Sequence, residues 1–180
     1  ETFLTDAKAP KKNLVGELNK GWTIAKRLLQ HERAMISGMG LGGGGGAGPG
    51  IEQAAKDYIG EENGRIADPS VRDKIVRQKM DSQAFALTMR RSAEEAKAGQ
   101  GPGAASSMFK YYGTELNKRR YELLLEVMGI QGLGWEGEGF SDDELTTTRA
   151  WLRSKGNSIE GGTSEVQLNV IAKRVLELPE

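Results

Sequence analysis

The chain has 180 residues, with 25 basic and 25 acidic side chains, one histidine and no cysteine. This length suits a single domain with a core of its own. The lack of cysteine excludes disulfides, thiolate nucleophiles and cysteine-ligated metal sites, and the single histidine, His31, excludes a cluster of histidine ligands. The balanced charge gives no reason to expect nucleic acid or an anionic membrane as a partner, and no apolar run is long enough to span a bilayer. We therefore expect an intracellular domain that depends on carboxylates, hydroxyls, backbone dipoles or a bound cofactor.

The spacing of apolar residues is helical along most of the chain. Residues 1–16 show no helical period and predict an extended strand that ends at Ala9-Pro10, followed by a loop. After this strand, apolar residues recur three and four positions apart and do not alternate with period two. They predict helices over residues 21–37, 51–60, 69–98, 105–128, 141–154 and 163–178, with a turn at EENGR between the second and third.

Short polar motifs mark where three of these helices begin. Asp68, which is followed by proline, is typical of an N-cap. Ser141 and Glu144 have the spacing of a capping box. Either Thr163 or Ser164 caps the last helix. The pattern as a whole predicts an all-α fold, an up-and-down four-helix bundle with a short N-terminal strand or linker remnant.

Glycine is concentrated in a run at residues 38–50, GMGLGGGGGAGPG, where we expect the first helix to break. Its composition favours a flexible linker between helices. A phosphate-binding loop is the alternative, and we reject it because the run has no Gly-Lys-Ser/Thr ending and no strand before it. A second glycine-rich break, at residues 99–103, separates the third helix from the fourth.

Glu32 is the first candidate functional residue. It stands three or four positions from Leu28, Leu29 and Ile36, on the apolar stripe of its helix. A carboxylate is costly to bury there unless it is paired or functional, and burial would raise its pKa toward that of a general base. Spacing alone favours the alternative, an edge glutamate that pairs with a neighbouring arginine or lysine.

The second candidate site is the segment at residues 158–167, SIEGGTSEVQ. Two glycines before a capped helix allow close approach of a ligand and present N–H groups at the positive end of the helix dipole. This geometry suits a phosphate or an electron-rich ring edge. Without further information, an ordinary helix start is the more common explanation.

Longer motifs in the chain resemble the acyl-CoA dehydrogenase family, whose members oxidise acyl-CoA thioesters with a flavin. The run GGTSEVQLNVIAKRVLELP at residues 161–179 is similar to the C-terminal signature of the family. Residues 3–22, FLTDAKAPKKNLVGELNKGW, resemble the strand, proline and linker that join its middle β-domain to its helical domain. LLQHER at residues 28–33 resembles the start of the first bundle helix, and MGIQG at residues 128–132 resembles a Gly-x-x-Gly turn.

The resemblance implies a domain organisation and an activity. Residues 1–18 would be the end of the middle β-domain and its linker, and residues 19–180 the C-terminal helical bundle. The implied reaction oxidises an acyl-CoA thioester to a 2,3-enoyl-CoA, with electron-transfer flavoprotein as the acceptor, in a homotetramer or homodimer of the cytoplasm or mitochondrial matrix. Since the remaining domains of the family are missing here, we expect the 180 residues alone to be inactive.

The resemblance also points to two places for the catalytic base, a glutamate that removes the α-proton while hydride passes from Cβ to the flavin. In most members it immediately precedes the Gly-Thr of the signature; that position is Gly161 here, and Glu160 is one residue earlier. In a minority it lies on the first bundle helix just before an arginine, as Glu32 does before Arg33. We therefore expect Glu32 to be the base, with Glu160 as the alternative.

FAD is the cofactor that the resemblance implies, held between the β-domain, this bundle and a neighbouring subunit. The signature positions at the cofactor are Gly162, Thr163, Ser164 and Glu165. Gly129 and Gly132 match the turn that approaches the FAD of a neighbouring subunit. Two positions depart from the pattern: Leu168 replaces the arginine after the signature glutamine, and an Arg-x-x-Phe-Gly motif is absent near residues 60–70.

These departures and Gly161 favour a second hypothesis. The chain would then be a non-catalytic helical subunit or interaction module that pairs with a catalytic acyl-CoA dehydrogenase homologue. Glu32 argues against it, because a subunit without catalytic function does not need a carboxylate in that place.

Overall fold

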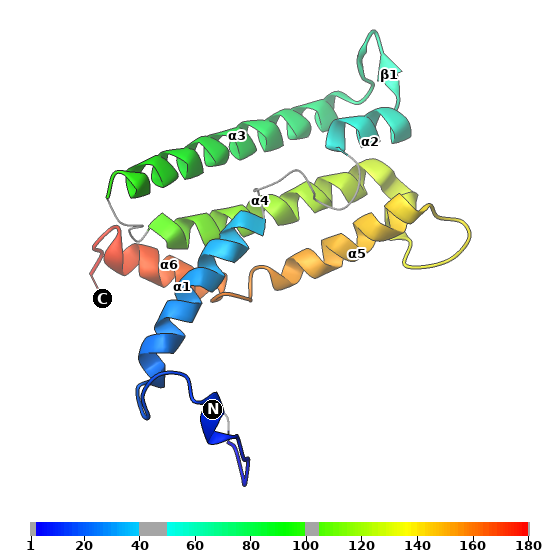
Figure 1. Cartoon of the computed structure of the whole chain (residues 1–180). Helices are drawn as coiled ribbons and strands as arrows, with labels where there is room; N and C mark the ends of the chain where they lie inside the picture. Colours follow the sequence, from blue (N-terminus) through cyan, green and yellow to red (C-terminus); the bar gives the residue numbers. More distant parts are fainter. Residues whose placement is uncertain (1–2, 40–49, 100–104, 180) are drawn as a thin grey trace.

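The computed structural model describes residues 3–39, 50–99 and 105–179 of the chain (Figure 1). Its α-helices are α1 (Gly21–Met39), α2 (Ile51–Tyr58), α3 (Pro69–Lys97), α4 (Ala105–Met128), α5 (Asp142–Gly156) and α6 (Ser164–Arg174). Two 3₁₀ turns, η1 (Lys11–Asn13) and η2 (Gly129–Leu133), and two short strands, β1 (Glu61–Glu62) and β2 (Arg65–Ile66), complete the described elements. The expected all-α fold is confirmed. None of the helices in these ranges has both the length and the apolar character needed to cross a membrane.

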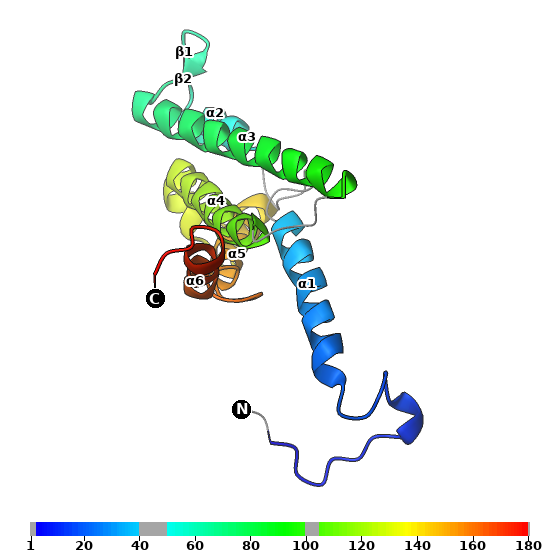
Figure 2. The same cartoon turned by 90° about the vertical axis from the view of Figure 1, so that its left-hand side faces the viewer.

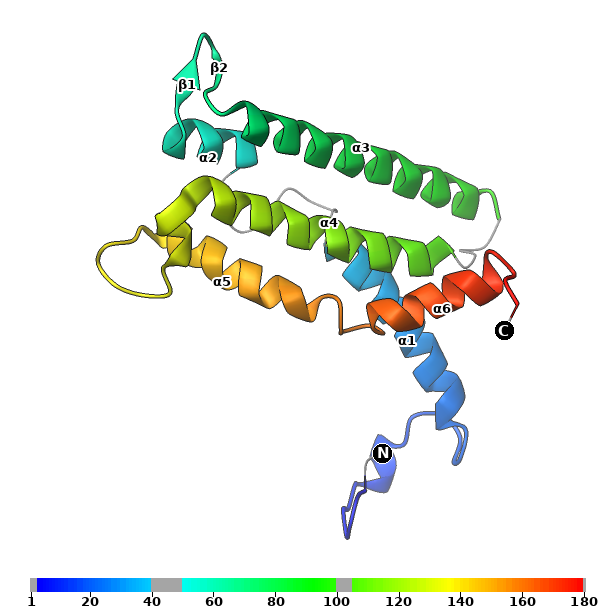
Figure 3. The ribbon, with the colours of Figure 1, turned by 180° about the vertical axis from the view of Figure 1, so that it is seen from behind.

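Helix α4 lies at the centre of the arrangement and contacts α1, α2, α3, α5 and α6. Helices α3, α4 and α5 lie side by side with alternating directions (Figures 1 and 3). Helix α6 follows the end of α5 and packs against α4. Helix α1 crosses α4 obliquely, and its N-terminal end points away from the other helices (Figure 2).

The core forms two clusters along α4. The larger cluster joins α2, β2 and α3 to the C-terminal half of α4, and its buried members are Ala54, Ala55, Ile66, Val71, Ile75, Tyr121, Leu123, Leu124 and Val127. The smaller cluster contains Phe85 of α3 with Phe109 and Leu116 of α4. The rings of Phe85 and Phe109 meet edge to face, with 5.9 Å between their centroids. Both clusters therefore depend on side chains of α4.

The three helix starts that the motifs predict are confirmed. Asp68 Oδ1 accepts hydrogen bonds from the backbone N–H groups of Ser70 and Val71, at 2.7 and 3.1 Å. Ser141 and Glu144 form a reciprocal capping box. For α6 the structure selects Thr163 over Ser164 as the N-cap.

Glu144 also ties α5 to α2, because its carboxylate accepts a hydrogen bond of 2.7 Å from the hydroxyl of Tyr58. Burial and this carboxylate together raise the pKa of Tyr58 to about 12. The pKa of Glu144 is lowered, mainly by the backbone N–H of Ser141 and also by Tyr58. Glu144 therefore has a structural role: it caps α5 and links it to α2.

The turn expected at EENGR is a β-hairpin in which Glu61 pairs with Ile66 and Glu62 pairs with Arg65. Asn63 and Gly64 both have positive φ, 52° and 72°, as a two-residue type I′ hairpin requires. Ile66 turns inward and joins the larger core cluster, so the hairpin is anchored between α2 and α3.

Three expectations from the sequence are not confirmed: the N-terminal strand, the end of α6 and the linkers. Residues 3–9 hold no strand, because a strand needs a neighbouring strand to bond with, and the described chain supplies none there. Helix α6 ends at Arg174, before the expected residue 178, and Glu177 has a positive φ of 51°. The expected linkers fall mostly on residues 40–49 and 100–104, which lie outside the described residues.

The apolar stripes predicted from the sequence are only partly covered. The large apolar side chains that stay exposed on them include Trp22 and Leu28 of α1, Val76, Met80 and Leu87 of α3, and Val166 of α6. On α6, it is instead Ser164 and Gln167 that are buried. Apolar faces of this kind are typical of surfaces that contact another domain or subunit.

We predict that Leu124→Ala lowers the free energy of unfolding of this chain by about 2–5 kcal/mol, because Leu124 is completely buried in the larger core cluster. Leu133→Ala is the matched control, since Leu133 is 78% exposed, and we expect a change of at most about 0.5 kcal/mol. Urea denaturation followed by circular dichroism measures both values. Equal losses in the two variants would contradict the central position of α4.

Candidate functional site

The connection between α5 and α6 turns on two adjacent glycines with positive φ, Gly161 at 67° and Gly162 at 91°. At Gly162 a Cβ atom would lie only 2.6 Å from Nε2 of Gln167, so both the backbone conformation and the space favour glycine. The same Nε2 donates a hydrogen bond of 3.1 Å to the carbonyl of Gly161. Gln167 therefore fixes the turn that leads into α6.

The first N–H groups of α6 are already bonded within the chain. The N–H of Ser164 donates to the carbonyl of Ser158 at 2.9 Å, and that of Val166 donates to Oγ1 of Thr163 at 3.3 Å. Glu165 is exposed; its pKa is lowered, first by its own backbone N–H and then by the hydroxyl of Thr163. At Ser164 and Val166, the N–H groups expected to be available to a ligand are therefore bonded within the chain.

At the start of α6, two polar side-chain atoms lack hydrogen bonds. Within the described part of the chain, Oγ of Ser164 and Oε1 of Gln167 are buried and have no hydrogen-bond partner. Buried polar atoms without partners are uncommon in folded proteins and mark places where a ligand, an ion or water is bonded. The start of α6 therefore still has the character of a binding site, through side chains rather than through its backbone.

Glu160 lies in the same connection, but its carboxylate is occupied on both oxygens. Arg153 donates to Oε2 at 2.8 Å, and Asn157 donates to Oε1 at 2.5 Å. The pKa of Glu160 is lowered, mainly by the hydrogen bond from Arg153. A carboxylate held in this way is a weaker proton acceptor and is not free to turn toward a substrate.

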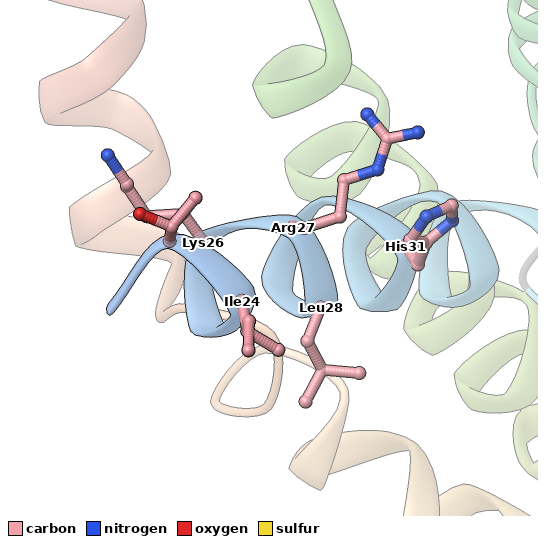
Figure 4. A pocket seen from close by; sticks show the side chains of 6 residues that line it. Ile24, Lys26, Arg27, Leu28 and His31 are labelled. Carbon is pink, nitrogen blue, oxygen red and sulfur yellow. The ribbon is translucent and has the colours of Figure 1, made fainter. Parts of the chain in front are cut away.

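Glu32 has different surroundings. It is half-buried on α1, and among the side chains that the structure describes, none donates a hydrogen bond to its carboxylate. One turn earlier on the same helix lies Leu28, which lines a groove of about 640 Å³ together with Ile24, Arg27 and His31 (Figure 4). Ile24 and Leu28 point to one side of the helix and Arg27 to the other (Figure 4). The two candidate bases thus differ in whether the carboxylate is engaged.

Gly129 and Gly132 lie in η2, directly after α4. Gly129 has a positive φ of 56°, and a side chain added there would meet open space. Gly132 is buried, and a Cβ atom there would come within 3.0 Å of the carbonyl of Leu125. Its own carbonyl accepts a hydrogen bond of 3.0 Å from Thr148, which ties the turn to α5.

The structure does not bring these two glycines next to the start of α6. Gly132 is bonded to Thr148, near the middle of α5. The connection that leads into α6 instead contacts α4 at Glu115, which accepts from Ser158 and lies 14 residues before Gly129, or about 21 Å at 1.5 Å per residue (Figure 3). The expected cofactor residues therefore form two separate groups in one chain, Gly162–Glu165 at one end and Gly129–Gly132 at the other.

Reasoning from the sequence missed Lys110, whose side chain is completely buried in α4. It shares a helix face with Ser107 and Thr114, and all three are buried. The spacing of three and four between these polar residues is the signal that could have indicated a buried polar stripe. Without knowing which face α6 covers, the same spacing equally fits a face in water.

Comparison with known proteins identifies relatives along nearly the whole chain. The sequence model described as "Acyl-CoA dehydrogenase, C-terminal domain" matches residues 19–176. Acyl-CoA dehydrogenase FadE34 of Mycobacterium tuberculosis is 33% identical over 180 residues, which cover 99% of this chain and 23% of that protein. The chain thus spans about a quarter of the length of this curated relative.

Solved structures agree in fold. An acyl-CoA dehydrogenase from Geobacillus kaustophilus superposes with a TM-score of 0.74 at 24% identity, over 96% of this chain and 43% of that one. A chain in the crystal structure of the ChsE4–ChsE5 complex from Mycobacterium tuberculosis superposes with a TM-score of 0.67 at 26% identity, over 96% of this chain and 44% of that one. Since the family model covers most of its residues, the chain belongs to the acyl-CoA dehydrogenase family and matches its C-terminal domain.

Proposed function

We propose that this chain is the C-terminal helical domain of a flavin-dependent acyl-CoA dehydrogenase, preceded by a linker at residues 1–18. The whole protein would oxidise an acyl-CoA thioester to a 2,3-enoyl-CoA. Membership of the family supports this activity, and the uncovered apolar faces of α1, α3 and α6 provide surfaces on which further domains would pack.

We propose Glu32 as the base that removes the α-proton. The observation that carries this choice is the engagement of the other candidate, since both oxygens of Glu160 accept hydrogen bonds and its pKa is lowered. Glu32 is half-buried on α1, one turn after Leu28, which lines the groove on that helix. Covering that groove with the acyl chain and a neighbouring domain would desolvate the Glu32 carboxylate and raise its pKa, which makes it a better base.

FAD would supply the hydride acceptor when bound. The residues of this chain that would hold it are Gly162, Thr163, Ser164 and Glu165 at one end of the bundle, and Gly129 and Gly132 at the other. The unpartnered hydroxyl of Ser164 supports a polar ligand at the first group. Because about 21 Å of helix α4 separates the two groups, the second group would approach the FAD of a neighbouring subunit.

Such sharing requires an oligomer, which we propose to be a homodimer or homotetramer that passes its electrons to an electron-transfer flavoprotein. The alternative is a hetero-oligomer in which this chain belongs to the non-catalytic partner of a catalytic homologue. One structural relative belongs to the ChsE4–ChsE5 complex, whose name joins two different proteins, and this supports considering the alternative. Purification from the native source distinguishes the two, because a second dehydrogenase subunit that co-purifies in equal amount supports only the hetero-oligomer.

We predict that Glu32→Gln in the full-length protein abolishes the exchange of the substrate α-proton with deuterated water, because an amide cannot accept that proton. Glu160→Gln is the matched control, and we expect it to retain exchange within about tenfold of the unmodified protein. Exchange is measured by mass spectrometry of the acyl-CoA. Loss of exchange in Glu160→Gln together with its retention in Glu32→Gln would reverse the assignment. Absence of exchange and of dye reduction in the unmodified protein would contradict the proposed activity.

We also predict that Arg153→Met raises the pKa of Glu160 toward its ordinary value, because the Arg153 guanidinium is the main cause of the lowered pKa. The pair stabilises the fold above the ordinary pKa of a glutamate, near 4.5, and this contribution is lost as the pH falls through the lower pKa of the folded state. Since Arg153 is largely exposed, the contribution at neutral pH is at most about 1 kcal/mol.

NMR titration of the Glu160 carboxyl carbon measures the pKa directly, and Arg149→Met is the control. Arg149 lies one turn before Arg153, donates to the carbonyl of Trp135 and does not contribute to the lowered pKa of Glu160, so its loss leaves that pKa unchanged. An unchanged pKa in Arg153→Met would remove the main argument against Glu160 as the base.

A further inference from the structure

Lys110 of α4 is the largest of the fully buried side chains in the described residues. Its ammonium has no hydrogen-bond partner within that part of the chain. Burial lowers the pKa of Lys110, while the charges of Glu160 and Glu115 oppose this effect. A buried cation without a bonded partner is costly, so packing alone does not explain a lysine here.

The stretch of α4 around Lys110 lies against the connection between α5 and α6. The hydroxyl of Ser158 lies 3.3 Å from a carboxylate oxygen of Glu115 and donates to it. One turn further on, Nδ2 of Asn117 donates to Oδ1 of Asn157, also at 3.3 Å. Helices α4 and α6 are in contact. The charge of Lys110 acts on both Glu160 and Glu165, which places its ammonium close to the residues that flank the glycine turn.

The α6 side of this contact carries two further buried atoms that have no partner among the described residues, Oγ of Ser164 and Oε1 of Gln167. Their chemistry complements that of the lysine, because an ammonium only donates, an amide oxygen only accepts, and a hydroxyl does both. Gln167 holds the glycine turn through its other amide atom, which donates to Gly161. A shift of Gln167 would therefore move the turn and the start of α6 with it.

We propose that Lys110 is a positioning residue: the charge of its buried ammonium favours the form of the glycine turn and of the first turn of α6 that binds an anionic dinucleotide. It also supplies positive charge behind a helix start whose first N–H groups are already bonded within the chain. This inference rests on the proposed function, since FAD is the dinucleotide in question. It assigns a role to a residue that none of the proposed cofactor contacts includes.

If Lys110 has this role, its substitution weakens the binding of FAD without lowering the stability of the apoprotein. Methionine has a volume similar to that of lysine and carries no charge, so Lys110→Met removes the cost of burying a cation and keeps the packing. We expect the apoprotein of this variant to melt at the same temperature as the unmodified protein or higher. We expect its dissociation constant for FAD to rise roughly tenfold, because the variant removes a buried positive charge close to the site of an anionic ligand.

The experiment uses the full-length protein in its apo and FAD-loaded forms, with FAD affinity measured by the quenching of flavin fluorescence and stability by calorimetry. Lys74→Met is the matched control, because Lys74 is a half-exposed lysine of α3 paired with Glu126, outside the proposed site. It should leave the affinity for FAD unchanged. Combining Lys110→Met with Ser164→Ala tests whether the two side chains act together, in which case the losses of affinity are less than additive.

Four results would overturn the inference. Unchanged FAD affinity in Lys110→Met would show that the lysine does not position the cofactor site, and the proposed function would stand. A fall in melting temperature of the apoprotein in proportion to the loss of affinity would make the role merely structural, as would additive losses in the double variant. Failure of the unmodified full-length protein to bind FAD would overturn the proposed function and this inference together.

Discussion

The burial of helix α4 on most of its sides is the constraint on which the rest of this structure depends. Both core clusters draw their side chains from it, and each of the other described helices contacts it. A helix in this position is stabilised by the apolar area that its neighbours remove from water. Within the described residues, α1, α3, α5 and α6 pack mainly on α4 and not on one another, so their positions are set by the faces of α4.

The central position of α4 also determines how the candidate site is divided. Its N-terminal half carries Lys110 beside the start of α6, and its C-terminal end leads directly into the turn of Gly129 and Gly132. A helix of 24 residues is about 36 Å long and does not bend back on itself, so one chain keeps these groups apart. The division favours a cofactor site completed by another subunit, which agrees with the uncovered apolar faces of α1 and α6.

Three glutamates differ in role because they differ in the hydrogen-bond donors around their carboxylates. Glu144 is buried and bonded to Ser141 and Tyr58, which makes it a structural group. Glu160 is held by Arg153 and Asn157 and has a lowered pKa. Glu32 has no such donors among the described side chains. The proposed base is thus the one of the three for which the described side chains provide no donor, and a proton acceptor must be free to meet its substrate.

The sequence by itself determined the helices and most of their ends, because apolar periodicity and capping motifs such as Asp68 and Ser141 depend on residues within one or two turns. Apolar periodicity indicated Glu32 as a candidate, and resemblance to a family made it the expected base and added Gly129 and Gly132. Only the tertiary structure decided which faces are buried. It placed Lys110 and Gln167 inside and left Val166 outside, since burial depends on which distant helix covers a face. Local spacing carries no information about that distant neighbour.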